Sequence, residues 1–92
     1  MKFEMKMRRI KESDIRAECP FLPDPDDYEM YLDSLVDDIK SLEFIRHVER
    51  VEDVISFKVK DGINEEVIRH KIKPFITDER SCQYRVVEMK RS

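Results

Sequence analysis

Apolar and charged residues alternate strictly at the start of the chain. Over residues 2–9, one side of an extended segment holds the apolar residues Phe3, Met5 and Met7. A period of two is typical of a strand with one buried face and one solvated face. The same alternation predicts strands over residues 54–60 and 82–90.

Two other segments repeat their apolar residues every three or four positions, as amphipathic helices do. The first begins with Asp24, which suits an N-cap, and Pro25, which suits the first helical position. Its expected buried stripe consists of Tyr28, Leu32, Leu35, Ile39 and Leu42, and we expect it to end near Leu42. The second begins after Asn64 as N-cap, and Pro74 predicts a stop or kink near Lys73.

Residues 44–51 read as one more strand, but their phase is ambiguous. Phe44 with Val48 and Ile45 with Val51 compete for the buried side. The pattern therefore predicts a strand here and leaves its register open.

The element order is strand, helix, strand, strand, helix, strand over a single domain of residues 1–92. This βαββαβ order favours an α+β, ferredoxin-like split βαβ sandwich, because connections avoid crossing one another. We expect a four-stranded antiparallel sheet with two helices on one face, the other face being open. Residues 10–23 form a long connection, in which Ser13 or Asp14 can cap one helical turn.

Charge is distributed unevenly along the chain. The net charge is −3, yet residues 24–43 contain eight acids and one lysine, which leaves +4 on the remainder. On the open sheet face, the alternation places Lys2, Lys6, Arg8, Lys58, Lys60 and Arg85. Such a face is either solvated surface or a site for an acidic or phosphate-bearing partner.

Nucleic-acid binding by this face would depend on the phosphate backbone. Phe3, Phe57 and Tyr84 all fall on the buried side of their strands, where they cannot stack on bases. An RNA or DNA complex would therefore be held by charge and weakened by salt.

The sequence contains no catalytic, cofactor or metal motif that we can identify. Cys19, Cys82 and the two histidines lack the spacings of metal ligands. Two cysteines are too few for a disulfide framework, so we expect reduced thiols. Cys19, inside the 10–23 connection, is a candidate reactive thiol.

No apolar run reaches the length of a membrane span, and the first residues do not resemble a signal peptide. We expect a cytoplasmic protein without a membrane partner.

These observations predict a small, non-enzymatic interaction or assembly module with a protein partner, most simply a second copy. Self-association would use the open sheet face or the edge strand Gln83–Met89, with Val87 and Met89 exposed on that face. The alternative is an RNA- or DNA-binding protein whose basic sheet face contacts the phosphate backbone of the nucleic acid.

Overall fold

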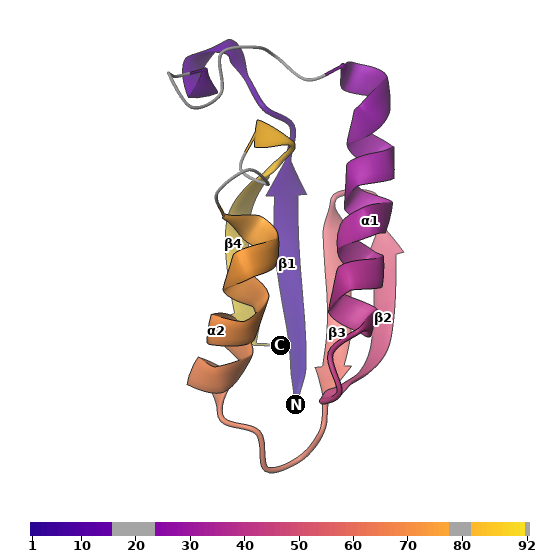
Figure 1. Ribbon diagram of the computed structural model, residues 1–92, viewed down its shortest axis with the longest axis vertical. Helices are drawn as coiled ribbons and strands as arrows, with labels where there is room; N and C mark the ends of the chain where they lie inside the picture. Colours follow the sequence, from indigo (N-terminus) through magenta and orange to yellow (C-terminus); the bar gives the residue numbers. More distant parts are fainter. Residues whose placement is uncertain (16–23, 78–81, 92) are drawn as a thin grey trace.

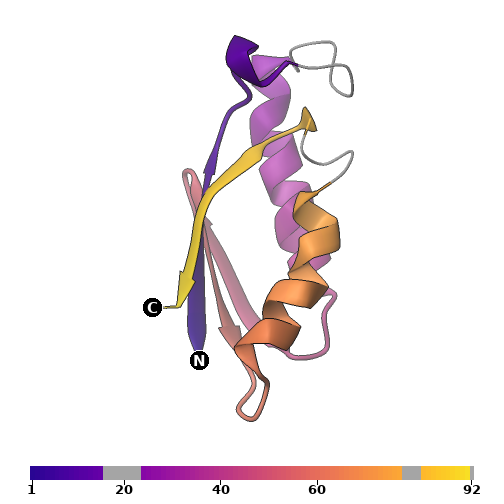
Figure 2. The same ribbon diagram turned by 90° about the vertical axis from the view of Figure 1, so that its left-hand side faces the viewer.

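The computed structural model describes residues 1–15, 24–77 and 82–91. In these residues a four-stranded antiparallel sheet has the order β2-β3-β1-β4. Two α-helices cover one of its faces (Figures 1 and 2). The α+β class and the placement of both helices on one face are thus confirmed. The elements are β1 (Lys2–Arg8), α1 (Tyr28–Lys40), β2 (Ile45–Val51), β3 (Val54–Val59), α2 (Glu65–Ile76) and β4 (Arg85–Arg91).

The hydrophobic core lies between the sheet and the helices. It contains every predicted inward residue of β1, together with Ile55 and Phe57 of β3. The rings of Phe3 and Phe57 stack with their centroids 5.6 Å apart. The helix-period stripe is confirmed, because α1 buries Tyr28, Leu32, Leu35 and Ile39.

α1 begins later than its capping signal predicts. Pro25–Asp27 form a 3₁₀ turn, in which the Asp24 carboxylate accepts a hydrogen bond from the Asp26 N–H at 2.9 Å. The α-helix itself starts at Tyr28 and ends at Lys40. Asp24 therefore caps the turn that leads into the helix.

α2 begins as predicted, but it does not stop at Lys73. The Asn64 side chain accepts a hydrogen bond from the Glu66 N–H at 2.7 Å, as an N-cap does. The helix then continues through Pro74 to Ile76. Pro74 is exposed and lies in the last turn, where water can satisfy the carbonyl that loses its donor. The hydroxyl of Tyr84 also donates to the Phe75 carbonyl at 2.6 Å.

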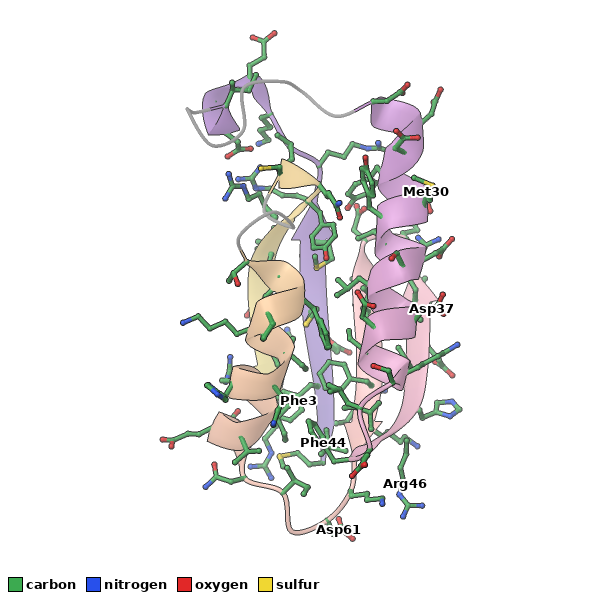
Figure 3. The ribbon with its side chains drawn as sticks, in the orientation of Figure 1. Phe3, Met30, Asp37, Phe44, Arg46 and Asp61 are labelled. Atoms are coloured by element: carbon green, nitrogen blue, oxygen red, sulfur yellow. The ribbon has the colours of Figure 1, made fainter. Side chains whose placement is uncertain are left out.

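A β-bulge in β2 resolves the ambiguous phase of that strand. The register shifts between Ile45 and His47, so Arg46 is the additional residue. Arg46 projects away from the domain at this edge (Figure 3). After the bulge, Val48 lies opposite Phe57 on the covered face. Val51 lies on the other face and is 70% exposed.

A second bulge, in β4, corrects the predicted position of Met89. The pairing of β1 with β4 shifts between Lys6 and Met7, so Val87 has no direct partner. Met89 consequently lies opposite Met5 and packs against the core. Strict alternation predicts that Met89 lies on the open face. This prediction is wrong, because the extra residue moves every later side chain of β4 to the opposite face of the sheet.

The start of the long connection folds back onto β1. Glu12–Asp14 form a 3₁₀ turn whose N-cap is Lys11, so a helical turn is present but Ser13 and Asp14 lie inside it and do not precede it as N-caps. The Asp14 carboxylate accepts hydrogen bonds from the Lys11 N–H at 2.8 Å and from the Arg8 guanidinium at 2.7 Å. Cys19 lies outside the described residues.

Cys82 is disulfide-bonded, which corrects the expectation of reduced thiols. The count of two cysteines argues against a framework of several bridges, but it does not exclude a single one. In the residues described, no helix combines the length and apolar character needed to cross a membrane.

Candidate functional site

The sheet face opposite the helices, which we call the open face, is covered by neither α-helix (Figure 2). Strand alternation and the observed registers determine which side chains belong to it. They are Lys2, Glu4, Lys6 and Arg8 of β1, His47, Glu49 and Val51 of β2, Val54, Ser56 and Lys58 of β3, and Arg85, Glu88 and Lys90 of β4.

The open face is not uniformly basic. Glu4, Glu49 and Glu88 lie among the predicted basic residues. The six predicted residues are consequently distributed over four different surroundings. Lys2 and Lys58 lie together, Lys6 lies among glutamates, and Arg8 and Arg85 lie at the far end of β1. Lys60 follows directly after β3 and is exposed.

Four charges on β1 and the edge strand β4 alternate in sign on the open face. Lys6 is the direct cross-strand partner of Glu88, and Glu4 is the direct partner of Lys90. Along each strand the sign also changes, because residues two apart share a face. With Val54 they line an open hollow of about 140 Å³. We call these four residues the charge checkerboard.

A basic row crosses three strands at the end of the sheet where β1 begins. Lys58 is paired with Lys2 on one side and with His47 on the other. Together with Ser56 and Glu49, these residues line a second hollow of about 140 Å³. His47 Nε2 lies 3.0 Å from Glu49 Oε1. We call Lys2, Lys58 and His47 the basic row.

Arg8 and Arg85 are paired across β1 and β4, next to the carboxylate of Asp14. The hydrogen bonds from Arg8 and then from the Lys11 N–H hold the pKa of Asp14 well below its usual value. Arg8 is therefore committed to an internal ion pair, which makes it less available to a partner than the open-face lysines.

The acidic surface of α1 is partly neutralised by the sheet. Arg50, on the covered side of β2, lies 2.7 Å from a Glu29 carboxylate oxygen and 3.0 Å from one of Asp33. Its side chain is only 20% exposed. Asp37 lies further along α1 (Figure 3) and is exposed. Part of the predicted acidic patch thus has a structural role in joining α1 to β2.

Both edge strands are poorly suited to pairing with another strand. Bulges interrupt β2 at Arg46 and β4 at Val87. In addition, a guanidinium nitrogen of Arg69 donates to the Met89 carbonyl at 3.2 Å, from α2. Bulges and charged cover are common protections of sheet edges. Val87 is 53% exposed, but Met89 packs against the core and does not join it in the apolar patch that the sequence predicts.

Within the described residues, no three His, Cys, Asp or Glu side chains come together in a way that could hold a metal ion. Sequence reasoning placed Lys2, Lys6 and Lys58 on the open face but missed Lys90 and Glu88, and with them the checkerboard. The faces of Glu88 and Lys90 depend on the bulge in β4, for which the sequence contains no clear signal.

The fold and this surface define a two-layer α+β domain with an uncovered, charged sheet face. No protein-family model, curated protein or solved structure matches the chain.

Proposed function

We propose that this protein is a non-enzymatic interaction module that self-associates through its open face. The observation that carries the proposal is the charge checkerboard, because its pattern is complementary to itself. None of its four residues takes part in the ion pairs found among the described residues. Their charges are therefore available to a partner.

Two copies of an alternating pattern can face each other with opposite charges in contact. A homodimer interface is usually two-fold symmetric, so that residue i contacts residue j and residue j contacts residue i. A two-fold axis parallel to the strands, between β1 and β4, places Lys6 over Glu88 and Glu4 over Lys90. An axis perpendicular to the strands places Lys6 over Glu4 and Glu88 over Lys90. Both arrangements pair all four charges with opposite charges.

The open face supports this role better than either sheet edge. The bulges and the Arg69 contact oppose strand addition, whereas Val54 and the exposed Val51 add apolar area beside the checkerboard. Apolar area surrounded by complementary charges is typical of protein–protein contacts.

Sedimentation equilibrium over a range of protein concentrations tests the proposal. We expect a monomer–dimer equilibrium that Lys6→Glu weakens by about two- to thirtyfold, since each exposed ion pair contributes roughly 0.2–1 kcal/mol and the symmetry removes two. Lys71→Glu, the same charge reversal on the exposed surface of α2, is the matched control and should leave the dimer intact. A protein that stays monomeric at all concentrations would refute self-association.

A second charge reversal distinguishes the two arrangements. If the axis is parallel to the strands, adding Glu88→Lys to Lys6→Glu restores association. If the axis is perpendicular, Glu4→Lys restores it instead. Failure of both double variants, with the wild type still dimeric, would place the interface elsewhere on the molecule.

The second candidate function is RNA or DNA binding through contacts to the phosphate backbone of the nucleic acid. It is supported by the adjacent lysines of the basic row, while the inward position of Phe3 and Phe57 leaves no aromatic platform for bases. Binding should then decrease steeply as salt rises.

We also infer a ferredoxin-like split βαβ sandwich, which is supported by the βαββαβ order and by the central position of β1 and β3. A cytoplasmic location stays a prediction. The disulfide at Cys82 argues against it, because disulfides are rare in the reducing cytosol outside hyperthermophiles.

A further inference from the structure

The basic row places like charges directly beside one another. Lys2 and Lys58 are cross-strand partners on β1 and β3, and His47 is the partner of Lys58 on β2. Directly opposed side chains in an antiparallel pair have Cβ atoms about 4.5–5.5 Å apart, and like charges at that distance destabilise a sheet. Neither lysine belongs to an ion pair of the described residues.

An anion placed between the two ammonium groups would convert this repulsion into attraction. The hollow that adjoins them is also lined by Ser56, whose hydroxyl can donate a hydrogen bond, and by His47. Glu49 is the opposing group, and its carboxylate lies 3.0 Å from His47. An incoming anion would therefore be held mainly by Lys2 and Lys58, with Ser56 as the neutral donor.

We propose that the basic row is a binding site for phosphate groups, held by Lys2, Lys58 and Ser56. Ammonium groups and hydroxyls are common ligands of phosphate oxygens. The site lies at one end of the open face, next to the checkerboard, and it does not depend on self-association. The phosphate can belong to a nucleic-acid backbone or to a small phosphorylated ligand.

The first test is an amide-shift NMR titration of the labelled protein with pyrophosphate. We expect shifts concentrated at Lys2, Ser56 and Lys58, and an affinity that Lys58→Gln reduces by about three- to tenfold, the effect of one solvent-exposed charge-assisted contact. Lys71→Gln is the matched control, because it removes one exposed lysine charge from α2, on the other side of the sheet from the basic row. It should leave the affinity unchanged within twofold.

The second test compares the thermal stability of the wild type and the variants with and without phosphate. Without phosphate, Lys58→Gln should be neutral or stabilising, because it removes the repulsion from Lys2. With phosphate, the thermal midpoint of the wild type should rise more than that of the variant, since a ligand stabilises the state that binds it. Lys71→Gln should not change the response to phosphate.

A titration with a short single-stranded RNA of mixed sequence identifies the source of the phosphate. RNA binding at the basic row that is much tighter than that of pyrophosphate indicates a nucleic-acid backbone. An RNA that binds no better than pyrophosphate indicates a small phosphorylated ligand. The proposal is overturned if neither probe gives shifts at the basic row. It is overturned equally if Lys71→Gln weakens binding as much as Lys58→Gln does.

Discussion

One hydrogen bond joins the start of α1 to the turn between β2 and β3, and we predict that its removal destabilises the domain. The hydroxyl of Tyr28 donates to the Asp53 carboxylate at 2.7 Å, and the backbone carbonyl of Asp53 accepts from the Met7 N–H at 2.7 Å. Asp53 therefore connects the turn to both α1 and β1. The variant Tyr28→Phe removes only the hydroxyl. It keeps the ring, over which the Arg9 guanidinium lies 4.3 Å from the centroid.

The expected loss is about 1–1.5 kcal/mol of unfolding free energy. A hydrogen bond to a charged group contributes roughly 1.5–3 kcal/mol. The expected loss lies at or just below the lower end of this range, because Asp53 is exposed and its carboxylate stays hydrated in the variant. Tyr28 itself is only 4% exposed, so the bond is shielded from one side. For a domain of this size the thermal midpoint should fall by about 5–10 °C.

Urea denaturation near neutral pH measures this loss directly. Tyr31→Phe is the matched control, because it deletes a hydroxyl from a half-buried tyrosine of the same helix, and this hydroxyl has no hydrogen bond to a described residue. Equal urea midpoints for the two variants would refute the role assigned to the Tyr28–Asp53 bond.

Alkaline pH provides an independent readout of the same bond. Burial, and then the hydrogen bond to Asp53, raise the pKa of Tyr28 above its usual value. A raised pKa in the folded state means that the stabilisation is complete below about pH 10 and is lost as the pH rises towards the folded-state value. The stability difference between the wild type and Tyr28→Phe should therefore shrink above about pH 10.

Three further predictions concern the turn after β3, the disulfide and the 3₁₀ turn. Gly62→Ala should lower the unfolding free energy measured by urea denaturation by about 1–2 kcal/mol, because Gly62 has φ +85°. An added Cβ meets no atom within 4 Å, so this loss reports backbone strain alone. Cys82→Ser should cost about 2–4 kcal/mol, and a reductant should lower the thermal midpoint of the wild type but not of this variant. Asp14 has a lowered pKa when folded, so its stabilisation is present above about pH 4 and is lost as the pH falls through the folded-state value. The stability of Asp14→Asn should accordingly vary less with pH below about 4 than that of the wild type, and an equal slope would contradict the Arg8–Asp14 interaction.

The sequence predicts most elements of this fold because their apolar periods are uninterrupted. The stripe from Tyr28 to Ile39 and the alternation of β1 each bury the residues that they identify. Local rules fail where the surroundings decide the outcome. Pro74 breaks helices in general, but it is tolerated here because it is exposed and lies in the last turn.

The bulges are the features that local patterns could not reveal. Arg46 and Val87 each insert one residue into a pair of strands, and neither is a glycine or another residue typical of bulges. The segment Val86-Val87 supplies an apolar residue for either phase, so the alternation alone selects the wrong face for Met89. The composition of the open face consequently depends on registers that only the structure provides.

These registers also explain why the open face supports two separate proposals. Before the bulge of β4 is taken into account, the face reads as one basic surface. With the bulge, Glu88 and Lys90 join Glu4 and Lys6 in a pattern that is close to neutral and can pair with itself. The positive charge is concentrated instead at Lys2 and Lys58, where strand pairing brings like charges together. Contact between two copies and capture of a phosphate group therefore use different residues of the same sheet face.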